Sequence, residues 1–156
     1  LATAVWIASL KGIAQVAGRL WELTFGQQLP ATTLGRLAIG ILPLSVAVLL
    51  ALGGSAEIAI IFTLVLGVSN GLVTIVRGAV PLALFGREGY GELLGVLAAP
   101  QLFMNAVAPF AYAALVEAYG ARAGLWALLG AAILSALAME LTALWVGYVR
   151  SARVKG

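Results

Sequence analysis

The chain lacks three residue types on which most enzymes and metal proteins depend, because its 156 residues include no cysteine, no histidine and no aspartate. Without cysteine it forms no disulfide, and without cysteine and histidine it offers neither the usual zinc ligands nor a Cys–His or Ser–His nucleophile pair. Six glutamates are the only carboxylate side chains. The G-x-x-x-x-G-K-[ST] loop of nucleotide-driven machines is also absent. We therefore expect no enzyme, and no metal or other cofactor.

Charge is also scarce. Charged residues make up 10% of the chain and hydrophobic residues 63%, and the mean hydropathy is +1.09. Because soluble domains are about one-quarter charged, this composition places lipid rather than water over most of the surface. The basic residues behind the formal charge of +3 lie mostly at the ends of apolar runs, which is typical of membrane orientation rather than of a nucleic-acid-binding patch. We expect a lipid bilayer as partner, and no nucleic acid.

Long runs of apolar residues make up most of the sequence. Each is close to the ~20 residues that cross a hydrocarbon core as a helix. A helix is expected because backbone groups in lipid must be satisfied within their own segment, and the alternating pattern of barrel strands is not seen. The sequence predicts an all-α integral membrane protein with about five transmembrane helices, at 2–20, 34–52, 58–76, 93–116 and 125–149.

Positive charge is distributed unevenly about these spans. One side carries Arg122 alone, and Lys11 lies within the first span. The opposite side comprises the connections 21–33 and 77–92 and the tail 150–156, and it holds or borders seven basic residues: Arg19, Arg36, Arg77, Arg87, Arg150, Arg153 and Lys155. The positive-inside rule places these regions in the cytoplasm, so we expect a multi-pass protein of the cytoplasmic (inner) membrane with a cytoplasmic C-terminus. Five spans then place the N-terminus outside, and we expect at least one further span upstream.

Polar residues recur at helical spacing in three of the spans. The first span has Lys11, Gln15 and Arg19, the third has Thr63, Gly67, Asn70, Thr74 and Arg77, and the fourth has Gln101, Asn105, Pro109 and Tyr112. Spacings of three and four residues place each set on one helix face. Either these stripes line a water-filled path, which we favour, or their hydrogen bonds only hold the helices together. Lys11 lies near mid-span, where a cation implies a cavity, a partner or a pathway unless it snorkels to the interface.

Glu140 lies about two turns inside the membrane from the cytoplasmic end of the fifth span. Three roles are open for it: a proton carrier, the ion-pair partner of a basic residue on a neighbouring helix, or a group that reaches the interface. We favour a structural role.

Glycine and proline predict how the helices pack. The Gly-x-x-x-Gly sequences at 67–71, 91–95 and 120–124 allow close backbone approach wherever they are helical. Pro100 and Pro109 each remove a helix hydrogen bond, so we expect the fourth span to bend.

Three stretches resemble one family. Gly18–Glu22 reads G-R-L-W-E and precedes Gly26, which is similar to a G-x-L-x-D/E cytoplasmic loop motif except that Gly26 stands one residue later than in that pattern. Thr74–Gly91 is similar to the loop between the tenth and eleventh spans of some bacterial members, and Ala108–Pro109 to the proline-bearing span that follows. On these stretches the chain resembles the C-terminal half of a bacterial major facilitator superfamily transporter, from the eighth to the twelfth span.

The resemblance implies an alternating-access carrier in which two six-helix halves rock about a site at the midplane. The chain would form most of one half-bundle, and the missing N-terminal half of the same transporter would be its partner. Glu22 would latch the cytoplasmic side against a neighbouring helix end, within a loop motif that comprises Gly18, Arg19, Leu20, Glu22 and Gly26. In the family the eighth, tenth and eleventh spans line the cavity, and these correspond to the three spans with polar stripes here.

The leading hypothesis is therefore part of a secondary active transporter for a small polar or anionic solute, with proton coupling and simple exchange both open. The preference for an anion depends on Lys11 and Arg77. The alternative is a non-transporting scaffold or assembly subunit in which the stripes only join helices. An intramembrane enzyme is the least favoured hypothesis. We expect the chain to be poorly stable without its partner half, because polar stripes would then face lipid.

Overall fold

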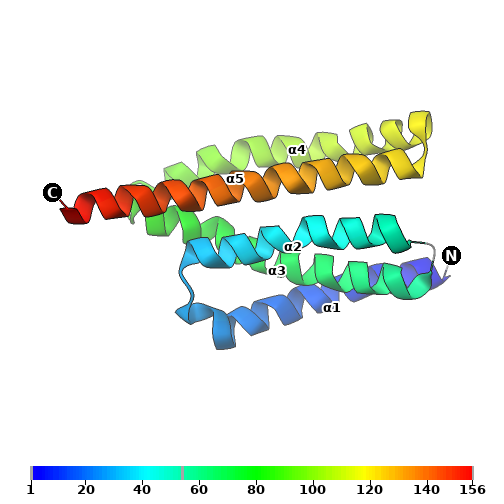
Figure 1. Cartoon of the computed structure of the whole chain (residues 1–156), viewed down its shortest axis with the longest axis horizontal. Coiled ribbons are helices and arrows are strands. Elements are labelled where there is room, and N and C mark those ends of the chain that lie inside the picture. The colour runs from blue at the N-terminus through cyan, green and yellow to red at the C-terminus, as the bar shows by residue number, and fades with distance from the viewer. Residues whose placement is uncertain (1, 54, 156) are drawn as a thin grey trace.

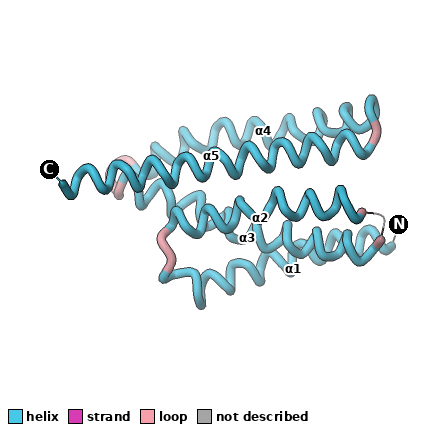
Figure 2. Tube along the Cα trace, viewed as in Figure 1, coloured by secondary structure: helices cyan, strands magenta, loops and turns pink. Residues whose placement is uncertain are grey.

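The computed structural model describes residues 2–53 and 55–155, and the side chains of these residues except 2–4, 8, 27 and 149–155. Long helices follow one another along the described chain (Figure 1): α1 (Ala2–Phe25), α2 (Ala31–Leu52), α3 (Ala56–Phe85), α4 (Tyr90–Tyr119) and α5 (Ala121–Lys155). A short 3-10 turn, η1 (Gly26–Gln28), continues α1. Every element in the described part is helical (Figure 2), which confirms the all-α fold expected from the sequence.

Four of these helices are long and apolar enough to cross a membrane, counted over the residues whose side chains are described. They are α2, α3, α4 and α5 as far as Tyr148, and their most apolar stretches have mean hydropathies between 1.5 and 2.2. The shortest, α2, has 22 residues, which at about 1.5 Å per residue spans the ~30 Å hydrocarbon core. The chain is therefore a multi-pass membrane protein. A span within α1 stays a prediction, because some of its side chains lie outside the described residues.

The connection expected at 77–92 is shorter in the structure, where it comprises residues 86–89. Residues 77–85 continue α3, because the charge at Arg77 changes one face of the helix and leaves its backbone hydrogen bonds intact. α3 ends instead at Gly86, whose φ of 79° is strained for any residue with a side chain and whose N–H donates to the Leu82 carbonyl at 3.0 Å.

The connection expected at 21–33 is also largely helical. α1 continues to Phe25, η1 follows, and only Leu29 and Pro30 separate η1 from α2. Pro30 has no N–H to satisfy and therefore suits the start of a helix. The polar character that predicted a loop here belongs to exposed helix faces, so the helices extend beyond the apolar runs that predicted them.

The helices pack in the order α1, α3, α2, α5 and α4, and each contacts the next. α4 and α5 form a hairpin that lies along α2 on the side away from α1 (Figure 1). The α1–α2 and α3–α4 connections lie at the same end of the molecule as the C-terminus (Figure 1), and we call this the connection end. The α2–α3 and α4–α5 connections lie at the other end, with the N-terminus.

The best-buried part of the structure lies between α2 and α3. Leu34 and Ala38 of α2 pack against Leu72 and Val76 of α3. Ser69 is completely buried beside them, and its hydroxyl donates to the Ala38 carbonyl at 2.5 Å. By contrast, none of the residues of α4, all of which are described, is buried. The α4 surface is therefore free of close neighbours along most of its length.

A seam of small residues joins α1 to α3. A Cβ added at Gly67 would lie 2.6 Å from both the Ala14 Cβ and the Lys11 carbonyl oxygen, and one added at Gly18 would lie 2.7 Å from the Val68 carbonyl oxygen. At Gly71 the added atom would overlap the Gln15 carbonyl oxygen. The structure thus confirms close backbone approach at the Gly67-x-x-x-Gly71 sequence.

The other two glycine pairs do not pack helices together in this way. A Cβ at Gly91 or Gly95 would meet nothing within 4 Å. Gly120, with a φ of 84°, ends α4, so it shares no helix with Gly124. Gly124 instead lets α5 turn back closely on the Tyr112 and Val116 side chains of α4. The spacing was misleading here because Gly120 supplies a turn conformation rather than a contact surface.

Candidate functional site

Three contacts between polar side chains of different helices in the described structure each include an arginine. Arg19 of α1 donates from Nε to the Thr74 hydroxyl of α3 at 3.3 Å. Arg36 of α2 pairs with Glu140 of α5, and Arg77 of α3 contacts Gln101 of α4. We call these six residues the arginine layer.

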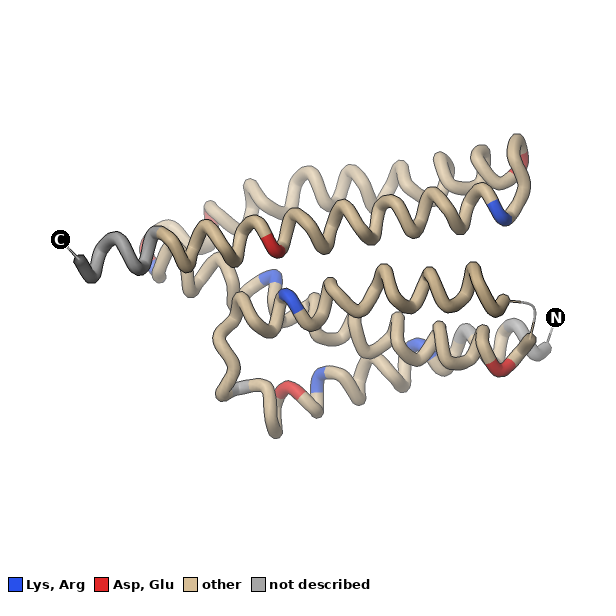
Figure 3. The backbone as a smooth tube through the Cα atoms, in the orientation of Figure 1, with Lys and Arg blue, Asp and Glu red and all other residues tan. Residues whose placement is uncertain are grey.

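The arginine layer lies at one depth along the bundle. At about 1.5 Å per residue from the helix ends opposite the connection end, Arg36 lies about 24 Å, Glu140 about 29 Å and Arg77 about 32 Å along its helix. A hydrocarbon core is about 30 Å thick, so the layer lies near the membrane boundary on the connection side. Charged positions of both signs lie toward that end in Figure 3. The layer contains three arginines and a single glutamate.

The Arg36–Glu140 contact is a two-pronged ion pair. Nε of Arg36 donates to Oε1 of Glu140 at 2.7 Å, and Nη2 lies 2.7 Å from Oε2. Both side chains are nearly half exposed, at 48% and 42%. Beside them Gly35 lets the Met139 side chain approach so closely that an added Cβ would lie 2.6 Å from Cε. Of the roles open to Glu140, the structure shows the pairing with a basic residue of a neighbouring helix.

The Arg77–Gln101 contact joins α3 to α4. With its amide oxygen turned toward the guanidinium, Gln101 accepts a hydrogen bond from Nη2 of Arg77 at 2.8 Å and another from Nη1. Closer to the connection end, the Tyr90 hydroxyl donates to the Gly78 carbonyl at 3.0 Å. Among the described residues Arg77 has no carboxylate within ion-pair distance, so its charge faces a neutral partner.

A cleft of about 490 Å³ opens beside this contact, between α2, α3 and α4. Its only polar lining residues are Arg77 and Gln101, and eight apolar residues complete it. A second hollow of about 510 Å³ continues from it and shares Val80, Pro81 and Leu97. The second hollow extends to α5, where Thr142 and Trp145 line it. The two hollows together form what we call the α3–α4 trough.

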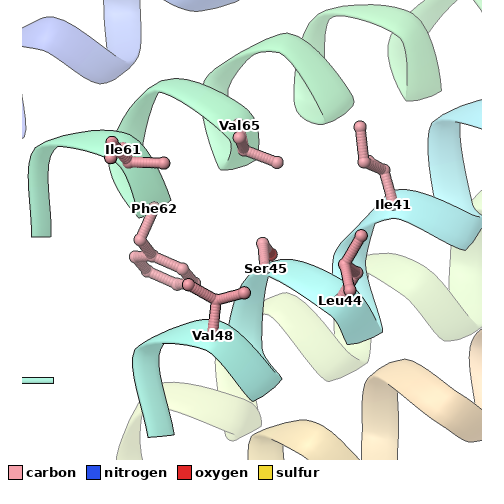
Figure 4. Close-up of a pocket in the computed structure, with 7 residues that line it drawn as sticks. All are labelled: Ile41, Leu44, Ser45, Val48, Ile61, Phe62 and Val65. Carbon is pink, nitrogen blue, oxygen red and sulfur yellow. The ribbon is translucent and has the colours of Figure 1, made fainter. Parts of the chain in front are cut away.

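A separate groove between α2 and α3 is almost entirely apolar (Figure 4). Side chains of the two helices point toward one another across a space of about 180 Å³: Ile41, Leu44, Ser45, Val48, Ile61, Phe62 and Val65. Ser45 is the single polar member, and its hydroxyl donates to the Leu42 carbonyl of its own helix at 2.8 Å. The groove therefore presents no group for recognition or chemistry.

The structure brings together only part of each predicted stripe. Lys11 is exposed on α1, whereas Gln15 is half-buried and its backbone faces the glycine seam. Asn70 is half-buried and Asn105 exposed, and neither side chain hydrogen-bonds to another described residue. The Thr63 hydroxyl donates to the Ala59 carbonyl of its own helix at 2.8 Å, and Tyr112 lies against the α4–α5 turn.

The predicted loop motif lies at the end of α1. Gly18 packs against the α3 backbone, and Leu20 is 56% exposed. Glu22 is half-buried, and a Cβ at Gly26 would lie 2.8 Å from its Cγ. Glu22 forms no ion pair with another described residue. Its role as a latch stays a prediction.

Residues 67–71 read G-V-S-N-G and match the G-x-S-x-G pattern of hydrolase nucleophiles. In a hydrolase that pattern forms a sharp turn between a strand and a helix, with a histidine as base. Here the five residues lie inside α3, Ser69 is completely buried, and the chain has no histidine. The match therefore marks a helix-packing segment.

Comparisons of the chain with protein-family models, with curated proteins and with solved structures give no match. The trough and the contact between Arg77 and Gln101 are therefore the features from which a function can be argued.

Proposed function

We propose that the chain is the C-terminal part of a secondary active transporter of the major facilitator type, which moves a small polar or anionic solute by alternating access. The observation that carries this proposal is the cleft whose two polar lining residues, Arg77 and Gln101, come from two different helices. A carrier needs polar groups that meet across helices able to move relative to one another.

Arg77 suits the binding of an anion. Its guanidinium offers five N–H donors, and its described partner is a neutral amide. An incoming carboxylate or phosphate replaces that amide with a charged acceptor in the same planar geometry. Binding is then reversible, because the Gln101 amide oxygen accepts hydrogen bonds from the guanidinium again when the solute leaves.

The exposure of α4 supports the presence of a second half. None of its residues is buried, and both Pro100 and Pro109 lie inside it without ending it. In the bundle α4 lies at one end of the packing order, so one of its faces is available to further helices. We propose that the N-terminal half of the same transporter covers this face and completes the site.

Uptake into vesicles by the full-length protein tests the proposal. Replacing Arg77→Gln removes the charge and keeps a similar length, and we expect anion uptake to fall at least about tenfold, which is typical of a lost charged hydrogen bond. Arg122→Gln, at the α4–α5 turn, is the matched control and leaves uptake unchanged. Equal uptake by both variants would contradict the proposal. Lys11→Ala tests the first stripe separately, because unchanged uptake removes Lys11 from the pathway.

The orientation can be tested independently. The chain has no native cysteine, so the labelling of a single introduced cysteine has no background from other cysteines of this chain. We propose a cytoplasmic C-terminus in the inner membrane, so Ser151→Cys reacts with an impermeant maleimide only from the cytoplasmic side. Ser55→Cys, at the α2–α3 connection, reacts only from outside. Reaction of both from one side would refute the orientation.

A non-transporting scaffold is the second candidate, and one observation favours it. The Arg19–Thr74 and Arg36–Glu140 contacts bridge helices without lining the trough. Such contacts hold a bundle together. If Arg77→Gln changes assembly or stability and the unmodified protein transports no solute tested, the scaffold replaces the carrier.

A further inference from the structure

The α3–α4 trough is polar at one end and, apart from Thr142, apolar along the rest. Arg77 and Gln101 lie in the first hollow, and the shared residues Val80, Pro81 and Leu97 continue it toward Trp145 on α5. Residues of four helices, α2 to α5, line it. Ligand sites commonly have volumes of about 300–1,000 Å³, and each hollow falls within that range.

The charge at the polar end is not neutralised within the described structure. The single carboxylate of the arginine layer, Glu140, uses both oxygens on Arg36. Arg77 contacts the neutral Gln101. A ligand with two oxygens on one carbon or phosphorus atom matches the guanidinium fork.

The apolar end argues against a ligand that consists of a small hydrated anion alone. Such an ion would use Arg77 and leave Leu97, Pro81 and the Trp145 ring in contact with water or lipid. A ligand with an apolar body covers these side chains and removes its own apolar surface from water. The lining therefore favours a ligand that has both a charged head and an apolar body.

From this lining we infer that the trough binds an amphipathic organic anion, with a carboxylate or phosphate head at Arg77 and Gln101 and an apolar body that extends along α3 and α4 toward Trp145. This deepens the proposed function by naming the class of solute, and it rests on that function only for the claim that the ligand is transported. The same chemistry occurs in a free alkyl carboxylate and in an anionic phospholipid. We assign the site to the free solute, because the proposed second half would cover α4, which lines the trough, and so separate the trough from lipid.

Fluorescence of Trp145 provides the test. The full-length protein is prepared with Trp145 as its single tryptophan, the others being replaced by phenylalanine, and is placed in nanodiscs of zwitterionic lipid. The probe is a medium-chain alkyl carboxylate with bromine on its terminal carbon. The bromine quenches the fluorescence of a tryptophan that it contacts. We expect saturable quenching of Trp145. In Arg77→Gln we expect binding at least about tenfold weaker, as is typical of a lost charged hydrogen bond.

Two controls separate binding from partitioning into lipid. The brominated alcohol of the same length lacks the charge and gives equal, non-saturable quenching in both proteins. A protein whose single tryptophan is Trp126, near the opposite end of α5, shows no difference between the carboxylate and the alcohol. Acetate in excess competes weakly, because it lacks the apolar body. Quenching that is equal with and without Arg77, or acetate that competes as well as a long-chain carboxylate, would overturn the inference.

A second arm identifies the source of the ligand. Anionic phospholipid brominated in its acyl chains replaces part of the zwitterionic lipid. If it quenches Trp145 only when Arg77 is present and excludes the alkyl carboxylate, the site belongs to the bilayer and the assignment to a solute is wrong. Uptake is measured in parallel, so that binding without transport contradicts the proposed function alone, and transport of small anions without Trp145 quenching contradicts this inference alone.

Discussion

Gly67→Ala should separate α1 from α3. An added Cβ at Gly67 would lie 2.6 Å from both the Ala14 Cβ and the Lys11 carbonyl oxygen, whereas ordinary contacts begin at 3.4 Å. The helices must therefore move apart by about 0.8 Å at this point, because neither a methyl group nor a backbone carbonyl can rotate away. Such overpacking costs about 1–3 kcal/mol of unfolding free energy.

Gly40→Ala in α2 is the matched control, since a Cβ there would meet nothing within 4 Å. Both substitutions gain the same helix propensity, up to about 1 kcal/mol, so this gain cancels when the two variants are compared. We expect Gly67→Ala to be less stable than Gly40→Ala by about 1–3 kcal/mol. Adding Ala14→Gly should recover only part of the loss, because the Lys11 carbonyl remains in place.

The measurement is the free energy of unfolding in mixed detergent micelles, obtained by titrating with a denaturing detergent and following tryptophan fluorescence. Trp21 lies on α1 and reports the release of that helix. Indistinguishable stabilities for the Gly67 and Gly40 variants would refute close packing at the seam. A full recovery with Ala14→Gly would show that the side chain, and not the backbone, sets the contact.

Three further substitutions test other contacts. Ser69→Ala removes a buried interhelical hydrogen bond and should cost about 0.6 kcal/mol, with an upper bound of about 1.7, in the same unfolding assay; no change would mean that the bond contributes nothing. Arg36→Gln and Glu140→Gln should each destabilise the protein more than the double variant does, because each leaves one charge unpaired, and a double variant equal to the sum of the singles would exclude coupling. Tyr90→Phe should cost about 1 kcal/mol and speed hydrogen exchange at the α3–α4 connection, and unchanged exchange there would contradict its role.

The sequence predicted the helices better than it predicted where they end. Apolar runs of membrane-spanning length placed all five helices in the right order, because backbone in lipid has few alternatives to a helix. The ends were displaced because charge was taken as the sign of a loop. Arg77 lies within α3, while Gly86 ends it, since positive φ rather than polarity stops a helix.

The arginine layer shows which part of the candidate site could be predicted from the sequence. Four of its six residues were identified as members of polar stripes from spacing alone: Arg19, Thr74, Arg77 and Gln101. Periodicity indicates which face of a helix is polar but not which helix lies opposite. Arg36, which no stripe included, forms the strongest of the three contacts with Glu140, and 104 positions separate the two residues.

The sequence by itself determined that this chain is helical and lies in a membrane, because long apolar segments with few charges are stable in a bilayer as helices. Only the tertiary structure decided that α1 packs on α3 and α2 on α5, that Glu140 is paired, and that Arg77 faces a neutral partner beside an apolar trough. The physical reason is that lipid is as apolar as the helices themselves. The hydrophobic effect therefore places the helices in the bilayer without choosing their neighbours, and close contacts at small residues and pairs of polar groups make that choice.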